Sequence, residues 1–214
     1  AQADPLEIIA EQFALEEVEM DFSPRYNVAP GQQVAVVLKD VKRIMTGLKW
    51  GLVPSWAKDP SIGNRMINAR AETVLEKPSY KNAMKKRRCL IPASGFYEWK
   101  KDGKVKVPHY FRLKSGKPFG LAGLWETWKD PDGKELATFT IITTEPNELA
   151  ARVHNRMPVI IPEESYGTWL DIANSPQKAQ TLLAPYPENQ MEAYAVSTMV
   201  NSPANDSEEL VRPV

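Results

Sequence analysis

Polar residues recur at every second position in residues 67–72, which read Ile-Asn-Ala-Arg-Ala-Glu. In an extended chain the side chains of Asn68, Arg70 and Glu72 would face one side. An amide and a guanidinium on one face could hold a phosphate or a sugar oxygen, because arginine presents a planar fork of donors. The alternative is a surface ion pair between Arg70 and Glu72, which would contribute little stability. Both interpretations remain open from the local sequence.

A carboxylate lies between two aromatic residues in residues 96–99, Phe-Tyr-Glu-Trp, within a predicted strand. If Glu98 is desolvated there, its carboxyl pKa is raised, which would suit proton transfer near neutral pH. The alternative is that Glu98 lies on the solvated face of the strand.

Histidine is the natural proton shuttle at neutral pH, and the chain has two of them. His154 lies where a predicted helix gives way to a strand, which makes it the stronger catalytic candidate, although a lone histidine is often only a structural hydrogen-bonder. His109, in a stretch that alternates polar and apolar residues, is expected to have only that structural role.

Aromatic residues cluster in residues 50–56, Trp-Gly-Leu-Val-Pro-Ser-Trp. Nucleic-acid bases stack on such rings, but core packing is the ordinary role of tryptophan. We therefore expect Trp50 to be buried and Trp56, in a proline-rich loop, to be the stacking candidate. Cys89 begins a buried strand, and this position predicts an inert thiol.

Composition limits the classes of function. The chain has 214 residues, 43% of them hydrophobic and 25% charged, as in ordinary globular domains. Lys plus Arg and Asp plus Glu both total 27, so any binding of a polyanion must depend on local geometry. One cysteine and two histidines give neither a disulfide nor a Cys/His zinc site, and we expect no metal and no cofactor. We find neither a long apolar run nor a signal-peptide pattern, and expect a cytoplasmic protein.

Periodicity and turn residues predict the elements that position these side chains. A helix should begin at Asp4-Pro5, a buried strand should span residues 34–38, and residues 44–50 should pair with it. A structured loop follows over 51–69, and an antiparallel meander with Asp-Gly or Ser-Gly turns at 102–103, 115–116 and 132–133 spans about 94–144. Further helices are predicted over 147–153, 163–171 and 175–183, with strands over 157–161 and 194–198.

These elements predict the fold class. We expect one α+β domain over residues 1–214, with a curled, mostly antiparallel β-sheet, a pseudo-barrel, and peripheral helices. The polar tail, residues 201–214, is expected to be loosely held against the surface. The chain is expected to be a monomer.

Five segments, taken in order, closely resemble the SOS-response-associated peptidase family. They are residues 26–31 (Tyr-Asn-Val-Ala-Pro-Gly), 50–56, 67–72, 94–99 (Ser-Gly-Phe-Tyr-Glu-Trp) and 154–158 (His-Asn-Arg-Met-Pro). Each segment alone is a weak signal, but all five in this order are specific. The resemblance implies recognition of abasic sites in single-stranded DNA and covalent capture of the ring-opened sugar by an N-terminal cysteine through a thiazolidine ring. It also implies that the protein removes its own initiator methionine.

The resemblance also implies roles for individual residues. Asn68 would lie near the N-terminal amine and the sugar, Glu98 would shuttle protons, and His154 would assist sugar ring opening or reversal of the crosslink. The DNA contacts would be made by Pro30 and Trp56 against flanking bases, and by Arg70 and Arg156 to phosphates.

The family begins with Met-Cys-Gly-Arg, whereas this sequence begins Ala1-Gln2-Ala3. The resemblance therefore predicts a cysteine upstream of Ala1. Two alternatives stay open: a noncovalent module for single-stranded DNA, and a cysteine-type peptidase that uses Cys89 and His154. If DNA is the partner, affinity for undamaged strands should be modest and should fall with added salt.

Overall fold

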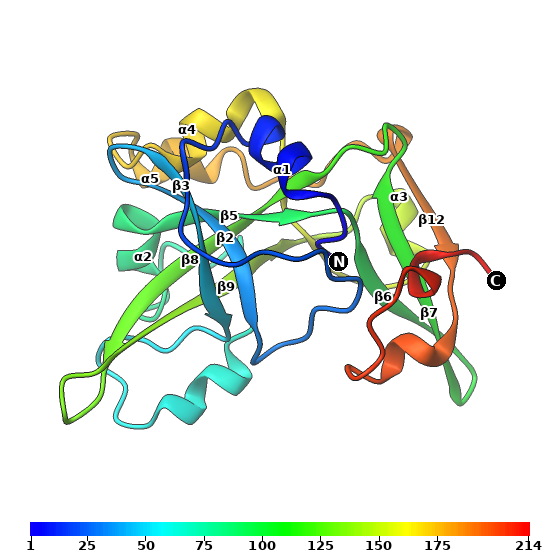
Figure 1. The fold of residues 1–214 in the computed structure, drawn as a ribbon, viewed down its shortest axis with the longest axis horizontal. Helices are drawn as coiled ribbons and strands as arrows, with labels where there is room; N and C mark the ends of the chain where they lie inside the picture. The colour runs from blue at the N-terminus through cyan, green and yellow to red at the C-terminus, as the bar shows by residue number, and fades with distance from the viewer.

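Two β-sheets form the centre of the computed structural model, which describes residues 1–214 (Figure 1). The larger sheet contains β1 (Glu17–Val18), β2 (Gln33–Lys39), β3 (Arg43–Trp50), β4 (Asn68–Arg70), β5 (Arg88–Ala93), β8 (Phe119–Lys129), β9 (Glu135–Thr144), β10 (Met157–Pro158) and β11 (Ile160–Ile161). The smaller sheet has the order β12 (Met191–Ala195), β7 (Val105–Leu113), β6 (Phe96–Asp102). The α-helices are α1 (Leu6–Gln12), α2 (Lys81–Lys86), α3 (Glu148–Ala151), α4 (Tyr166–Leu170) and α5 (Pro176–Gln180).

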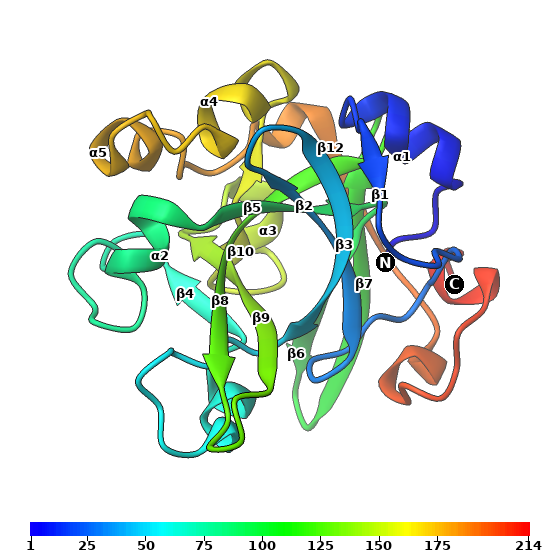
Figure 2. The ribbon, with the colours of Figure 1, turned by 60° about the vertical axis from the view of Figure 1, so that its left-hand side comes forward.

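The larger sheet curls back on itself. Its central path runs β3-β2-β5-β8-β9, mostly antiparallel, and β3 also pairs in parallel with β9 through Lys49 with Thr138 and Trp50 with Phe139. Figure 2 shows these strands bending around a common centre, with α4 and α5 on the outside. The predicted α+β fold with a curled sheet and peripheral helices is confirmed.

Both faces of this sheet are buried, which explains why its strands read as continuous apolar runs. On one face, Val37 and Leu90 pack in a cluster with Phe13 of the α1 region and Trp169 of α4. The neighbouring residues point to the other face, where they pack with Phe111 of the smaller sheet. Residues of this second face, among them Val34 and Phe139, also line a pocket between the two sheets.

The predicted single meander over residues 94–144 is wrong in one respect. Two hairpins do form, β6–β7 and β8–β9, with Gly103 and Gly133 at positive φ in their turns. However, β7 and β8 belong to different sheets. The free edge of β7 pairs with β12, and β8 lies between β5 and β9, so neither strand has an edge left for the other.

Other predicted elements occur with shifted ends. The strand expected over 157–161 is two short strands that pair with β9 and β8 on either side of Val159. The last strand ends at Ala195 rather than at residue 198, because the side chain of Ser197 caps a 3₁₀ helix. The loop over 51–69 contains a 3₁₀ helix, Pro60–Arg65, and the start of β4. None of the helices has the length and apolar character needed to cross a membrane.

Candidate active site

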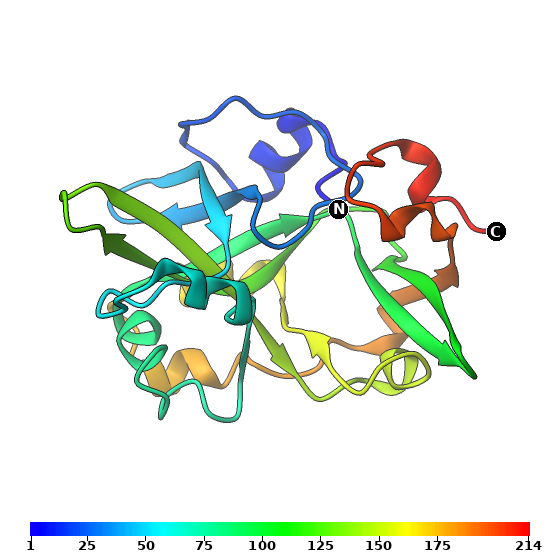
Figure 3. The same ribbon diagram turned by 90° about the horizontal axis from the view of Figure 1, so that it is seen from below.

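A pocket of about 480 Å³ opens between the two sheets. The N-terminus lies there beside the C-terminal segment, as the course of the backbone in Figure 3 shows. Apolar side chains of the larger sheet, including Val34 and Phe139, line part of the pocket. Four of the seven predicted site residues also line it, and they come from four separate segments: Pro30, Asn68, Glu98 and His154. The three predicted catalytic residues are therefore brought together.

The other three predicted DNA contacts, Trp56, Arg70 and Arg156, lie outside this lining. Asn68 and Arg70 are exposed while the intervening Ala69 is buried, so both polar side chains lie on one side of β4, as the alternation predicts. Trp56 is 60% exposed. Trp50, expected to be buried, is only partly so; it lines the pocket and its indole N–H donates to the carbonyl of Ile67.

Glu98 and His154 form the titratable pair of the pocket. The Nδ1 atom of His154 lies 3.8 Å from Oε2 of Glu98, and the two side chains are 43% and 25% exposed. Burial raises the pKa of the Glu98 carboxyl, and the neighbouring His154 opposes part of that rise. The pair is suited to proton exchange, because a carboxyl of raised pKa stays partly protonated closer to neutral pH.

Arg156 is held in a fixed orientation by its contacts with Glu72 and Thr143. Its guanidinium forms a bidentate ion pair with Glu72, at 2.6 and 3.0 Å, and also donates to the carbonyl of Thr143 at 2.8 Å. The same guanidinium lowers the pKa of Glu72. The Arg70–Glu72 pair considered from the sequence does not form, and Arg70 makes neither an ion pair nor a side-chain hydrogen bond, so its donors are available.

The first residues of the chain run into the pocket. The nitrogen of Ala1 donates to the carbonyl of Gly95 at 2.8 Å. Gln2 is buried and its side chain bonds to both backbone groups of Ala35 and to the carbonyl of Pro92, which fixes this segment.

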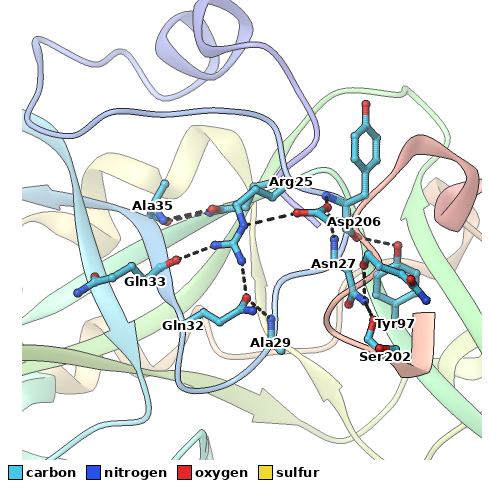
Figure 4. Close-up of polar contacts among 12 residues, drawn as sticks. Arg25, Asn27, Ala29, Gln32, Gln33, Ala35, Tyr97, Ser202 and Asp206 are labelled. Carbon is cyan, nitrogen blue, oxygen red and sulfur yellow. Dashed lines mark hydrogen bonds and ion pairs between the residues drawn. The ribbon is translucent and has the colours of Figure 1, made fainter. Parts of the chain in front are cut away.

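The C-terminal segment forms one wall of the pocket, and Asn27 anchors it (Figure 4). The Nδ2 atom of Asn27 lies 3.0–3.1 Å from the carbonyl oxygens of Val200, Ser202 and Asn205. In return, the carboxylate of Asp206 accepts hydrogen bonds from the backbone N–H groups of residues 26 and 27. We call these contacts the tail clamp.

The tail clamp corrects the expectation of a loosely held tail. Leu210 is fully buried, and Val200 and Asn201 line the pocket. The side chain of Asn201 accepts a hydrogen bond from the indole N–H of Trp99 at 2.7 Å. Sequence reasoning assigned no role to Gln2, Asn27 or Asn201, because their partners are backbone groups or residues far away in the chain.

The remaining candidates lie outside the pocket. Cys89 is fully buried, and burial raises its thiol pKa well above the ordinary value, in agreement with the predicted inert thiol. His109 faces the carbonyl of Val107 at 3.1 Å, a structural contact. No three His, Cys, Asp or Glu side chains converge as they would around a metal ion.

Comparisons with known proteins agree on one family. Residues 1–203 match the family described as SOS response associated peptidase (SRAP). The chain is 50% identical over 208 residues to the abasic site processing protein YoqW of Bacillus subtilis (strain 168), covering 95% of this chain and 93% of that protein. It is 34% identical over 226 residues to the abasic site processing protein HMCES of Gallus gallus, covering 90% and 67%.

Solved structures share the fold. A crystal structure of a protein from Bordetella bronchiseptica superposes with a TM-score of 0.80 at 26% identity, covering 92% of this chain and 97% of that one. A second, from Bacteroides thetaiotaomicron, gives a TM-score of 0.79 at 30% identity, covering 86% and 82%.

Proposed function

Because the chain belongs to the SOS response associated peptidase family, whose relatives include abasic site processing proteins, we propose that it captures abasic sites in single-stranded DNA covalently. The bond would join the ring-opened sugar to a cysteine at the mature N-terminus, upstream of Ala1. The observation that carries this proposal is the pocket itself, which Asn68, Glu98 and His154 line together with Ala1 and Gln2 at the start of the chain.

The position of Ala1 supports delivery of an N-terminal cysteine to this pocket. An extended chain spans about 3.5 Å per residue, so a cysteine only a few residues before Ala1 stays within reach of Glu98 and His154. An uncharged amine is the form that attacks an aldehyde.

The proposed reaction consumes an aldehyde, an amine and a thiol and releases one water. The amine nitrogen adds to the aldehyde carbon, and the resulting carbinolamine loses its hydroxyl as water to give an imine. The thiol sulfur then adds to the imine carbon while its proton passes to the nitrogen, which closes the thiazolidine ring. Each addition or loss of water moves a proton and therefore benefits from a positioned acid or base.

The pocket residues suit these proton transfers. Glu98, whose pKa is raised by burial, would protonate the departing hydroxyl and then receive the thiol proton for return to the nitrogen. His154, 3.8 Å away, would exchange that proton with Glu98 and assist opening of the sugar ring. The amide of Asn68 would hold the sugar oxygen and the amine next to each other.

DNA would lie across the mouth of this pocket. Pro30 at the rim and the exposed ring of Trp56 would pack against bases next to the lesion, which requires a splayed single strand. Arg70, which has no protein partner, would bind a phosphate directly. Arg156 would have to share its guanidinium between a phosphate and Glu72.

The experiment uses the full-length protein, with its N-terminal residue read first by mass spectrometry. The protein is incubated with single-stranded DNA that carries one abasic site and run on a denaturing gel, with intact DNA as control. A shifted band that requires both the abasic site and an N-terminal cysteine supports the proposal. Loss of that band in Glu98→Gln protein whose N-terminal cysteine has been verified by mass spectrometry, with noncovalent DNA binding retained, would assign the proton transfers to Glu98.

An unshifted band from protein with a verified N-terminal cysteine would refute covalent capture and leave a noncovalent DNA-binding module. Nothing in the structure favours a cysteine peptidase built on Cys89, because its thiol is buried outside the pocket. Removal of an initiator methionine by the same pocket is a further part of the proposal. The mass measurement on protein carrying Glu98→Gln tests it, because retained methionine is then expected.

A further inference from the structure

A second depression, of about 380 Å³, continues from the pocket along the β6–β7 hairpin. Glu98, Trp99, Lys101, Lys106, His154 and Asn201 line it. Glu98 and His154 belong to both cavities, so the depression begins at the reacting groups and leads outward. We call it the hairpin groove.

Two lysines of the hairpin groove lie directly opposite each other on neighbouring strands. Lys101 of β6 is the register partner of Lys106 of β7, and neither forms an ion pair with a carboxylate. Like charges directly opposite in an antiparallel pair are destabilising, so this arrangement costs the hairpin some stability. The concentration of positive charge contrasts with a chain whose net charge is zero. A bound anion would offset the repulsion between these lysines.

Asn201 adds an uncharged donor near the catalytic end of the groove. Its side-chain oxygen accepts the indole N–H of Trp99 at 2.7 Å, which orients the amide and leaves its NH₂ group for another partner. The tail clamp fixes the backbone on both sides of Asn201, since Asn27 bonds the carbonyls of Val200 and Ser202. The donor is thus held rigidly beside Glu98 and His154.

We propose that the hairpin groove holds the phosphodiester backbone of the DNA strand on one flank of the abasic nucleotide, with Lys101 and Lys106 on phosphates and Asn201 on the phosphate or sugar nearest the lesion. This inference rests on the proposed function for the identity of the ligand. Its own support is the continuity of the groove with the pocket and the unpaired cations along it. Lysines bind phosphate as point charges and release condensed counterions, so the contribution depends on salt.

The test measures binding of a fluorescent single-stranded oligonucleotide with a central tetrahydrofuran residue, an abasic analogue that has no aldehyde and cannot be crosslinked. Dissociation constants are determined over a series of salt concentrations for wild type and for Lys101→Gln/Lys106→Gln. Because each phosphate contact on a single strand contributes about 0.7 to the slope of log K against log salt, the double variant should lose about 1.4 of that slope. Its affinity at low salt should fall roughly tenfold or more.

The matched control is Lys114→Gln/Lys117→Gln, which removes two lysines from a separate cavity bordered by Gln12 and Tyr166 and should keep the wild-type slope and affinity. A Lys101→Gln/Lys106→Gln variant with the wild-type salt slope would overturn the proposal that the hairpin groove binds DNA, even if wild type crosslinks to true abasic DNA. The proposed function would then stand without the groove. Conversely, the expected loss of slope in a protein that never crosslinks would support the groove while refuting covalent capture. Equal losses in Lys114→Gln/Lys117→Gln would show nonspecific charge effects and would also overturn the assignment.

Discussion

Replacing Asn27 with alanine should release the C-terminal wall of the pocket. Asn27 is 6% exposed, and its single amide nitrogen serves three carbonyl oxygens at 3.0–3.1 Å. That nitrogen carries two hydrogens, so the substitution removes about two full hydrogen bonds, each worth about 1 kcal/mol net. The buried carbonyl of Val200 would also lose its partner, which adds about 1 kcal/mol or more. We expect the free energy of unfolding to fall by about 3 kcal/mol.

The loss should be local as well as global. Hydrogen exchange of the peptide over residues 198–206 should accelerate, because the clamp would retain only the Asp206 contacts to the backbone of residues 26 and 27. Affinity for single-stranded DNA should fall with it, since Asn201 would no longer be fixed in the hairpin groove. The loss of stability is measured by urea unfolding, and the faster exchange of the tail by mass spectrometry. The weaker DNA binding is measured by the fluorescence anisotropy of labelled DNA.

Asn189→Ala is the control, because that asparagine is exposed and its side chain makes no hydrogen bond. Its unfolding free energy should stay within about 0.5 kcal/mol of wild type. If Asn27→Ala also stays within that range and the tail exchanges at the wild-type rate, the tail clamp does not hold the pocket wall. Asn27→Asp sharpens the test, since it keeps the shape but turns a carboxylate oxygen toward carbonyl oxygens and should be at least as destabilising as alanine.

Three further outcomes follow from the contacts of the site and its support. Glu72→Gln should release the guanidinium of Arg156 and tighten single-stranded DNA binding several-fold. The slope of log K against log salt should become steeper by about 0.7. Weaker binding would show instead that the Arg156–Glu72 ion pair is needed to keep the DNA-binding site in shape. Burial raises the pKa of Glu98 above the ordinary 4.5, so its ionisation destabilises the folded state as pH rises through the raised value. Glu98→Gln should therefore match wild type in urea at pH 4 and be slightly more stable at pH 7; the reverse order would mean that the ionised carboxylate is stabilised. Arg88, 2% exposed, donates to four backbone carbonyls, so Arg88→Met should lower the free energy of unfolding by about 3–5 kcal/mol, whereas exposed Arg152→Met should change it little.

Local patterns in the sequence predicted the elements whose causes are local. The Asp4-Pro5 start is followed by α1, the apolar run at residues 34–38 lies in β2, and Gly103 and Gly133 mark the turns of two hairpins. The division of the predicted meander between two sheets could not be read in this way. It depends on β12, a strand about 80 residues further along the chain that pairs with β7 from Met191 opposite Leu113.

The same distinction holds for the site. Alternation placed Asn68 and Arg70 on one side of a strand, since this follows from strand geometry alone. It also suggested Glu72 as a partner for Arg70, whereas Glu72 pairs with Arg156, 84 positions away. A two-residue spacing sets which way side chains point, but the closest opposite charge is set by the tertiary fold. The pairing of Glu72 with Arg156 leaves Arg70 free to bind a phosphate. At Arg156, a phosphate would have to compete with the carboxylate of Glu72. Arg70→Ala should therefore weaken DNA binding more than Arg156→Ala, and this difference should shrink once Glu72 is neutralised.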